Sequence, residues 1–356
     1  MKRNILITGG CGFVGSNLAV ALRAEGNKVA CFDNLSRPGS EILARRVREH
    51  GCIFIRGDIR DRNDLRSCTG GFDLLIDASA EPSVLAGSDG RDALYVVDNN
   101  LAGSVNCFEW CRRNNAGVIF LSSSRVYPYD RINALSYEES RGRFICTAKT
   151  AGVSGKGIGC GFPLDGYRSL YGATKLAAEF ILREYSLNYG IPAIIDRCGV
   201  IAGPWQLGKI DQGVFTHWMV SHYFKRKLSY IGFGGTGKQV RDILHVDDLA
   251  DLVKKQIRGI GRYRGDMFNV GGGAGASLSL REATALCRRI TGNTIPIGRE
   301  ARNRPADIKW YITDNQAVEN EFGWRPRRSA EETLADIGAW LAGNHKLAGR
   351  LFKVRK

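Results

Sequence analysis

The sequence predicts an α/β protein, built from a doubly wound parallel sheet and a smaller C-terminal substrate-binding domain. Over roughly the first 200 residues, short apolar segments alternate with amphipathic ones, a pattern typical of strands joined by helices. A glycine-rich turn joins the first strand to the first helix. The length of 356 residues also indicates one large α/β domain or two joined domains.

The predicted elements follow one another in a regular order. A strand at 4–10 precedes a helix at 11–26, in which Phe13, Leu18 and Leu22 share one face. The remaining elements of this part are a strand at 28–34, a helix at 40–50, strands at 52–59 and 73–79, a helix at 99–115 and a strand at 117–123.

These elements predict the division of the chain into domains. The NAD-binding domain is expected at 1–195 with a return near 238–275, and the substrate-binding domain at 196–237 and 276–356. The segment 147–163 is rich in glycine and has no periodicity, so we expect an exposed loop there.

Composition excludes several classes of protein. The chain is 44% hydrophobic and 24% charged, which is ordinary for a globular protein. No apolar run reaches the about 18–20 residues of a membrane span, and the first run stops at Thr8, too early for a signal peptide. Ten cysteines include no C-x-x-C pair, so we expect buried thiols, no metal site and a reducing cytoplasm.

The net charge of +15 raises the question of an anionic partner. Nucleic acid, an acidic membrane surface and an anionic small substrate all fit a basic protein. The lysines and arginines are scattered and do not stand among stacking aromatic residues. We therefore expect an anionic small molecule, and neither nucleic acid nor a membrane.

At the first strand–helix junction, Gly9, Gly12 and Gly15 have G-x-x-G-x-x-G spacing. Glycines there allow a tight turn and a close approach of the backbone to a pyrophosphate, while the helix N-terminus supplies N–H donors. Asp33 ends the second strand, where a carboxylate accepts both ribose hydroxyls of NAD and repels the extra phosphate of NADP. Nearby Arg37 weakens that repulsion slightly. The predicted cofactor is NAD; plain turn glycines and a strand-end aspartate are the alternative.

Tyr171 and Lys175 stand four residues apart in "YGATK", at the start of a predicted helix. Residues at i and i+4 share a helix face, with Cβ atoms about 5–6 Å apart. A lysine at that place is expected to favour the phenolate and so to lower the pKa of the tyrosine. Such a tyrosine suits general acid–base catalysis, whereas a surface Tyr–Lys pair is the alternative.

Residues 232–239, "GFGGTGKQ", nearly match a phosphate-binding P-loop. Gln239 stands where a Ser or Thr hydroxyl would hold magnesium, and the next residues favour a strand or turn over a helix. We therefore reject a P-loop.

The glycine motif, the strand end "SSSRVY" and "YGATK" together resemble the extended short-chain dehydrogenase/reductase family of nucleotide-sugar epimerases and dehydratases. The resemblance covers nearly the whole chain, because "RDILHVDDLA", "FNVGG" and "RPAD" look like C-terminal motifs of that family. Within it, "FDNLSR", "DQG" and "GTGKQVRDILH" look most like enzymes that invert carbon 2 of CDP-sugars. The resemblance implies a Rossmann-type NAD-binding domain.

The resemblance also implies a set of catalytic residues, Ser123, Tyr171 and Lys175. Tyr171 would remove the sugar hydroxyl proton while the sugar C–H gives hydride to NAD, and Ser123 would lie between the two oxygens. Lys175 would hold the cofactor ribose and the phenolate. Asn100 would support the site from the neighbouring helix, with a helix-start cap as the alternative.

The cofactor site implied in this way extends along the first half of the chain. Asp58 and Ile59, after the third strand, are expected to bracket the adenine. The residues expected to bind NAD are Gly9, Gly12, Phe13, Val14, Gly15, Asp33, Asn34, Asp58, Ile59, Ala78, Asn100 and Lys175.

Some positions depart from the family pattern. Related dehydratases carry Asp-Glu, and decarboxylases a Glu, where this chain has Ser124 and Arg125. Without a carboxylate there, 4,6-dehydration lacks its acid and base, which favours a reaction that needs only redox. Pro128 replaces a glycine, and Val200 stands in place of the asparagine of carbon-4 epimerases.

The C-terminal half is expected to hold the nucleotide. Arg241 and Arg304 match family arginines that hold the diphosphate, a role that suits a bidentate guanidinium. Asp307 would accept from the ribose. The full set expected to bind substrate is Ser124, Gln206, Gln212, Arg241, Arg304 and Asp307.

The sequence therefore predicts an isomerase, an NAD-retaining epimerase of a nucleotide-diphosphate sugar, with a CDP-sugar favoured. A transient keto-sugar would either turn over or lose and regain a proton. Carbon-4 epimerisation is the alternative among enzymes. Outside enzymes, the alternative is an NAD-binding regulator that contacts nucleic acid, which predicts a broken catalytic set.

A homodimer is expected through the helix at 99–115 and the helix that starts at Tyr171. The resemblance implies that two copies pair these helices as a four-helix bundle. The apolar residues expected at the interface are Leu101, Val105, Phe108, Leu176, Phe180 and Ile181.

Overall fold

The structure is a computed structural model that describes residues 2–87, 93–207 and 213–352. Its contacts group into two compact units. The first unit is Met1–Val126, Ser169–Cys198 and Leu249–Phe268, and the second is Tyr127–Arg168, Gly199–Asp248 and Asn269–Lys356. This grouping differs from the predicted boundaries, because the segment 127–168 joins the second unit and the return to the first is narrower. The segment 127–168 contributes no strand to the large sheet of the first unit.

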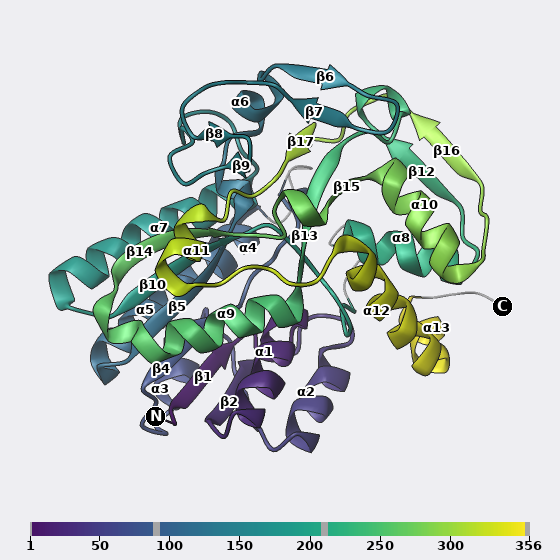
Figure 1. The fold of residues 1–356 in the computed structure, drawn as a ribbon. Coiled ribbons are helices and arrows are strands. Elements are labelled where there is room, and N and C mark those ends of the chain that lie inside the picture. The colour runs from purple at the N-terminus through teal and green to yellow at the C-terminus, as the bar shows by residue number, and fades with distance from the viewer. Residues whose placement is uncertain (1, 88–92, 208–212, 353–356) are drawn as a thin grey trace. The chain divides into compact units, whose positions relative to one another are not determined.

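The first unit carries the predicted alternation of strands and helices (Figure 1). Its strands are β1 (Asn4–Thr8), β2 (Lys28–Asp33), β3 (Ile53–Arg56), β4 (Leu74–Asp77), β5 (Gly117–Ser123), β10 (Ala193–Cys198) and β14 (Arg264–Val270). Its helices are α1 (Phe13–Ala24), α2 (Ser40–Glu49), α3 (Arg62–Arg66), α4 (Ala93–Val97), α5 (Gly103–Asn114), α7 (Leu170–Tyr189) and α9 (Val246–Gly259). A π-helical turn, Asp98–Ala102, leads into α5. The elements β14 and α9 extend a few residues into the second unit.

The seven strands form one sheet in the order β14-β10-β5-β4-β1-β2-β3. The ladders of β1 with β2 and β4, of β2 with β3, and of β5 with β4 and β10 are parallel. The strand order reverses beside β1, where Thr8 is paired with Asp77 of β4. The predicted doubly wound sheet is confirmed, and ligands of such sheets bind at the carboxyl ends of the strands near this reversal.

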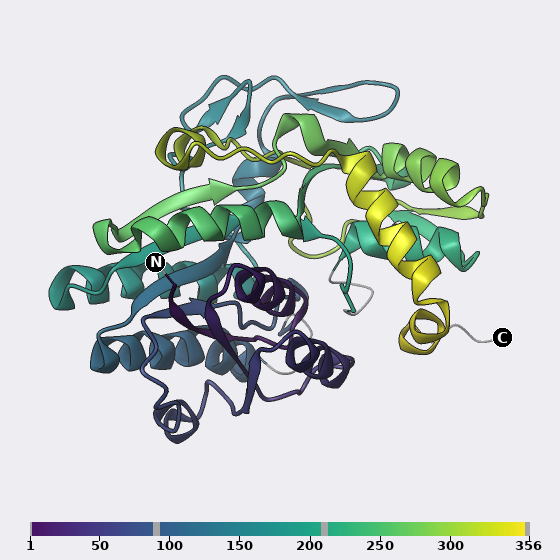
Figure 2. The same cartoon turned by 60° about the horizontal axis from the view of Figure 1, so that its bottom comes forward.

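The core on one face of the sheet packs strands against α5 and α7. Phe120 of β5 meets Phe108 of α5 edge to face, with ring centroids 5.6 Å apart. Ala178 and Leu182 of α7 belong to the same cluster, as do Cys107 and Cys111 of α5. Figures 1 and 2 show α1, α2 and α9 on the other face of the sheet. The expected burial of the thiols is confirmed for most of the cysteines, and all ten are free.

The second unit is built from several small sheets and a group of helices. Its strands are β6 (Tyr137–Glu139), β7 (Phe144–Cys146), β8 (Val153–Ser154), β9 (Gly157–Ile158), β11 (Val200–Ala202), β12 (Leu228–Ile231), β13 (Val240–His245), β15 (Ser277–Ser279), β16 (Ile297–Glu300) and β17 (Trp310–Tyr311). Its helices are α6 (Tyr129–Asn133), α8 (Val214–Tyr223), α10 (Leu280–Thr291), α11 (Gln316–Phe322), α12 (Ala330–Gly343) and α13 (His345–Leu351). The strand β13, which pairs with β11, β15 and β17, follows the P-loop-like segment. A strand at that place supports our rejection of a P-loop.

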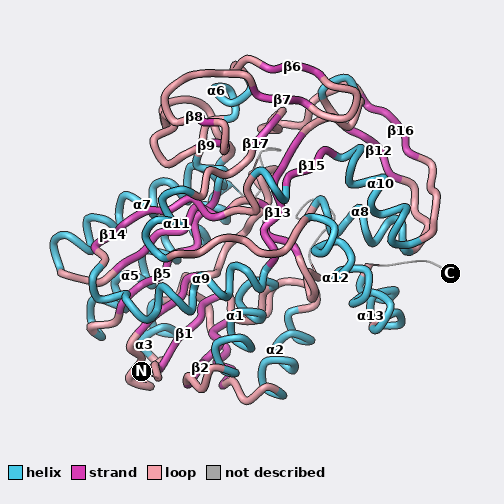
Figure 3. Tube along the Cα trace, viewed as in Figure 1, coloured by secondary structure: helices cyan, strands magenta, loops and turns pink. Residues whose placement is uncertain are grey.

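Segment 147–163 is only in part the exposed loop that the sequence predicted. Figure 3 shows mostly loop there, with the short hairpin of β8 and β9. Ile158 of β9 is fully buried, and its N–H donates to the carbonyl of Ile312 over 2.8 Å. The hairpin is therefore anchored on a distant part of the chain that no local pattern reveals.

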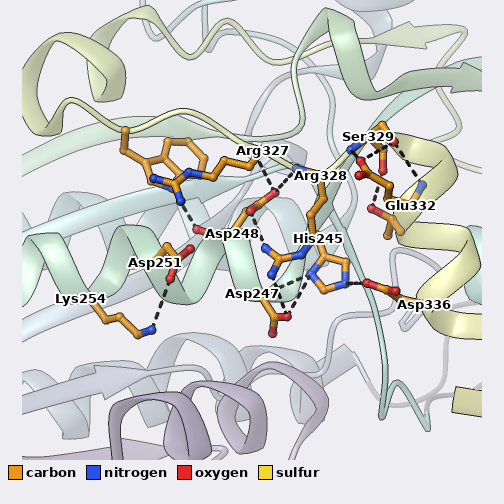
Figure 4. A network of polar contacts seen from close by, with 12 residues as sticks. His245, Asp247, Asp248, Asp251, Lys254, Arg327, Arg328, Ser329, Glu332 and Asp336 are labelled. Atoms are coloured by element: carbon orange, nitrogen blue, oxygen red, sulfur yellow. Dashed lines mark hydrogen bonds and ion pairs between the residues drawn. The ribbon is translucent and has the colours of Figure 1, made fainter. Parts of the chain in front are cut away.

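A polar network fixes the end of β13 to α12 within the second unit (Figure 4). The carboxylate of Asp248 accepts from the backbone N–H groups of Arg327 and Arg328 over 3.0 and 2.9 Å. The Arg328 guanidinium also pairs with Asp248 at 2.7 Å. The buried ring of His245 lies 3.4 Å from the carboxylate of Asp336 on α12. These contacts hold the strand that carries Arg241 in a fixed place.

Within the described ranges, no helix combines the length and the apolar character that a membrane span needs.

Candidate active site

The turn between β1 and α1 has the shape that the glycine motif predicts. Gly9 has a φ of +66°, and a Cβ there would lie 2.8 Å from the carbonyl oxygen of Ala78. A Cβ on Gly15 would lie 2.2 Å from the carbonyl oxygen of Gly9. Because α1 begins at Phe13, its first N–H groups have no partner within the helix and face this turn. The backbone therefore forms a cradle that fits a pyrophosphate and that side chains would fill.

Asp33 lies at the end of β2, next to this cradle. Its carboxylate accepts from the backbone N–H of Cys11 over 3.0 Å and of Leu35 over 2.8 Å. Burial raises the pKa of Asp33, whereas these two donors and the charge of Arg37 lower it. A carboxylate has about four acceptor positions, so two remain for the hydroxyls of a ribose. The residue thus fits the NAD ribose.

Asp58, after β3, is linked to Asn34, after β2. The Asn34 amide donates to Asp58 over 2.9 Å. Hydrogen bonds from Arg60, the largest effect, and from Asn34 lower the pKa of Asp58 to about 2. The side chain of Ile59 packs in the core against Gly103, where a Cβ would lie 2.5 Å from its Cδ1 atom. Asp58 and Asn34 therefore lie side by side after neighbouring strands, while the Ile59 side chain is buried in the core.

Ser123 and Tyr171 meet at the carboxyl end of β5. Ser123 is the last residue of that strand, and Tyr171 stands in the first turn of α7, which Ser169 caps by accepting from the Gly172 N–H over 3.3 Å. Both side chains are 8% exposed. Burial raises the pKa of Tyr171, and a hydrogen bond with Ser123 lowers it. The serine hydroxyl therefore lies close enough to the phenol to affect its ionisation.

Lys175 does not act on Tyr171 in the way that the spacing predicted. Its Nζ donates to the carbonyl oxygens of Leu121 over 3.1 Å and Ser79 over 3.3 Å, and lies 4.5 Å from the ring centroid of Phe120. Burial lowers the pKa of Lys175. The expected lowering of the pKa of Tyr171 by this ammonium is therefore not found, because the side chain is directed toward strand ends rather than along the helix.

Sequence reasoning missed Asp77, a fully buried carboxylate at the end of β4. It accepts from the hydroxyls of Thr8 over 2.9 Å and Ser104 over 2.7 Å, and from the N–H of Ser79 over 3.1 Å. Its negative charge raises the pKa of Lys175 and so opposes the effect of burial. An aspartate that ends an apolar strand was the one clue in the sequence.

Asn100 positions the loop after β4. Its amide oxygen accepts from the N–H of Glu81 over 2.7 Å, and its amide nitrogen donates to the carbonyl of Glu81 over 3.1 Å. The alternative of a helix-start cap is wrong, because Asn100 lies inside the π-helical turn. Glu81 raises and Arg125 lowers the pKa of Tyr171, so both charges lie close to the phenol. Neither was predicted to act there.

Ser124 follows Ser123 directly and is buried in the first unit. The other residues predicted to bind substrate belong to the second unit. Arg241 on β13 donates to Asp307 over 2.9 Å and to the carbonyl of Ile308 over 2.6 Å, so the two predicted ligand residues hold each other. Arg304 is exposed three residues before Asp307.

Gln206 is buried, and its amide bonds with the hydroxyl of Thr216 and the carbonyl of Ile201. Gln212 lies outside the described residues. Among those that are described, no group of three or more His, Cys, Asp or Glu side chains could hold a metal ion.

The fold of the first unit, its phosphate cradle and its buried Ser–Tyr–Lys set define an NAD-dependent enzyme of the short-chain dehydrogenase/reductase type. Residues 5–271 match the NAD dependent epimerase/dehydratase family, and the chain belongs to that family. The predicted NAD cofactor and the isomerase class are thereby confirmed.

Individual relatives extend over nearly the whole chain. CDP-paratose 2-epimerase of Salmonella typhi is 28% identical over 347 residues, which cover 94% of this chain and 98% of the relative. UDP-glucose 4-epimerase of Erwinia amylovora is 27% identical and covers 96% of this chain and 98% of its own. The crystal structure of Pal from Bacillus thuringiensis superposes with a TM-score of 0.79 at 24% identity, covering 96% and 99% of the two chains. The similarity to Pal shows a shared fold.

Proposed function

We propose that the protein is a nucleotide-sugar epimerase that inverts carbon 2 of a CDP-sugar through a transient keto-sugar. The observation that carries this proposal is that Ser123, Tyr171 and Lys175 are all buried in the first unit, with Ser123 close enough to Tyr171 to lower its pKa. Next to Ser123, the chain has Ser124 and Arg125 where dehydratases have carboxylates. The constellation therefore suits oxidation and reduction of a sugar carbon rather than elimination of water.

Each residue of this set has a distinct task. NAD, when bound, accepts a hydride from the sugar carbon and returns it. Tyr171 takes the hydroxyl proton as a base and gives it back as an acid. Ser123 orients the phenol, and the positive charge of Arg125 helps to offset the cost of a buried phenolate. Lys175 would hold the cofactor ribose.

Carbon 2 and the CDP moiety are supported by the similarity to CDP-paratose 2-epimerase along 94% of the chain. A second candidate is inversion of carbon 4 of a UDP-sugar, which the 27% identity to a UDP-glucose 4-epimerase favours. Val200, at the place of the asparagine of carbon-4 epimerases, speaks for the first candidate.

We propose that Arg241, Arg304 and Asp307 bind the nucleotide diphosphate. In the free protein the Arg241 guanidinium has Asp307 as a partner, 18% of whose side chain is exposed. An incoming phosphate would take over the guanidinium and release the carboxylate to a ribose hydroxyl. The pair thus keeps both charges satisfied until substrate arrives.

We also propose a homodimer, in the cytoplasm, that forms through α5 and α7. Of the predicted interface residues, Phe108 and Leu176 are buried in the protomer, whereas Phe180 is 52% exposed. Leu187 and Tyr189 on the same helix are 75% and 58% exposed. They line a hollow of about 510 Å³, and a second copy of α7 offers the apolar side chains to fill it.

The experiment that tests the proposed function is incubation of the purified protein with a panel of CDP-, UDP-, GDP- and dTDP-sugars. Nuclear magnetic resonance of the products identifies the inverted carbon. The proposal expects inversion at carbon 2 of a CDP-sugar. Inversion only at carbon 4 of UDP-sugars would select the second candidate, and no inversion in any arm would contradict both.

A further inference from the structure

A second cavity of about 510 Å³ opens in the second unit and is lined from α10 and the strands β12 and β16. Figure 1 shows where these three elements lie. None of its lining residues belongs to the predicted substrate set. Arg281 and Arg288 line it from α10, Arg299 lines it from β16, and Lys238 lies two residues before β13. The volume falls within the range of about 300–1,000 Å³ that is usual for small-ligand sites. The lining is cationic and includes no carboxylate.

Three of the four cations have no partner of their own in the described part of the chain. For Arg281, Arg288 and Arg299, no ion pair and no hydrogen bond of the guanidinium is found among the residues that the structure describes. Lys238, in contrast, pairs with Glu139 at 2.5 Å. The neighbour of Arg288 on α10, Arg289, pairs with Glu331 at 2.6 Å. Acidic partners are thus within reach of this helix, but they serve the arginines outside the cavity.

The hydroxyl groups of the lining already use their protons. Tyr230 donates to Thr284 over 2.8 Å, and Thr284 donates to the carbonyl of Leu280 over 2.8 Å. Thr236 donates to the carbonyl of Phe233 over 3.2 Å. The free donors are therefore guanidinium N–H groups, which have no acceptor in the cavity. Such a lining favours an anionic ligand over a neutral sugar.

The arrangement of the arginines indicates how many anionic groups the ligand carries. Arg281 and Arg288 lie seven residues apart on one face of α10. Two helical turns separate their Cα atoms by about 10.5 Å. Arg299 approaches from β16, where it is paired in register with Tyr230. Guanidinium groups bind phosphate by paired hydrogen bonds, so three of them suit a ligand with more than one phosphoryl group.

We propose that this cavity, the α10 groove, binds a small soluble polyphosphate: pyrophosphate or the polyphosphate part of a nucleotide. Three like charges that share one cavity repel each other, and a polyanion turns that repulsion into attraction. The cations of the groove also account for part of the net charge of +15. It is distinct from the proposed substrate residues, because Arg241 is directed toward Asp307 and lines no part of it. The proposal does not rest on the proposed epimerase activity.

The test is calorimetric titration of the full chain with inorganic pyrophosphate at about 0.15 M salt, where surface charges are screened beyond ~8 Å. All titrations use the Arg241→Gln background, so that pyrophosphate binding at Arg241 does not contribute to the measured heat. Arg288→Gln is compared with Arg289→Gln, its neighbour on the same helix. Both positions are exposed, so neither substitution is expected to unfold the protein.

The expected result is that Arg288→Gln weakens pyrophosphate binding about tenfold, the size of one charge-assisted hydrogen bond. Arg289→Gln should leave the affinity unchanged, and the combined Arg281→Gln, Arg288→Gln, Arg299→Gln variant should lose the binding event that Arg288→Gln weakens. Equal affinities for the parent and Arg288→Gln would overturn the proposal, as would an equal loss in Arg289→Gln. Binding to vesicles that carry multiply phosphorylated lipid, without binding of free pyrophosphate, would overturn it as well.

Discussion

The charged groups to which we assign roles are held in opposite ways in the two compact units. In the first unit, Lys175 is 1% exposed and Asp77 is fully buried, and each has a hydrogen-bond partner on the sheet, Leu121 for the lysine and Thr8 for the aspartate. In the second unit, Arg304 and the arginines of the α10 groove are exposed, and Arg241 has an acidic partner that a ligand can replace. With the proposed roles, this difference implies that the reacting groups are fixed before substrate arrives, whereas recognition works by exchange of partners.

The largest effect is expected from Lys175→Met. The substitution removes the donor to Leu121 and Ser79 and leaves Asp77 without a nearby cation, so both turnover and NAD retention should be lost. Turnover should fall by at least about 10²–10⁴. The readout is the nicotinamide nucleotide released from denatured protein. Lys28→Met, at an exposed position of the first unit, is the control, and normal NAD occupancy in Lys175→Met would refute the role.

A smaller effect of a different kind is expected from Arg241→Gln. Loss of charge-assisted bonds to the diphosphate, each worth about 1.5–3 kcal/mol, should raise KM by about 10–100-fold and leave kcat nearly unchanged. Steady-state kinetics on the substrate found in the panel provide the measurement. A fall in kcat with an unchanged KM would show that Arg241 acts in the chemical step, and would contradict the assignment of substrate binding alone to the second unit.

Ser123→Ala should shift the pH dependence of turnover. The base must be deprotonated, so turnover rises with pH through the pKa of Tyr171, which burial raises and the Ser123 hydrogen bond lowers. Removal of that bond raises the pKa further and moves the rising limb to higher pH. The loss at neutral pH should be smaller than the about 10²–10⁴ of a lost acid–base group. An unshifted limb would show that the serine does not tune the phenol.

The smallest effect on turnover is expected from Phe180→Asp. A charge at this exposed apolar position should break the proposed dimer while the catalytic set stays intact. Light scattering at micromolar concentration should then give the protomer mass, with kcat near that of the parent. Ile53→Asp, at a 60% exposed position on the edge strand β3, should keep the dimer. A monomeric parent protein would contradict the proposal at once.

Local spacing was enough to predict the parts of the site that lie close together in sequence. The turn at Gly9–Gly15, the acid at the end of β2 and the first turn of α7 each depend on a few neighbouring residues. The parallel, doubly wound sheet followed from the alternation of strands and helices, but the order of its strands was not predicted.

The parts that the sequence did not reveal depend on distant partners. Asp77 meets Thr8 only because β4 pairs with β1, and the ammonium of Lys175 reaches strand ends that its helix spacing does not indicate. Arg299 joins the α10 groove because β16 pairs with β12. Such contacts are set by register between strands, which periodicity does not encode.

The most direct test of the account is the turnover of Tyr171→Phe on the identified sugar, with bound NAD measured in the same sample. The phenyl ring keeps the packing of the buried side chain and loses the one oxygen that moves the proton. The account predicts that NAD stays bound while kcat falls by about 10²–10⁴. Wild-type turnover in Tyr171→Phe would contradict it.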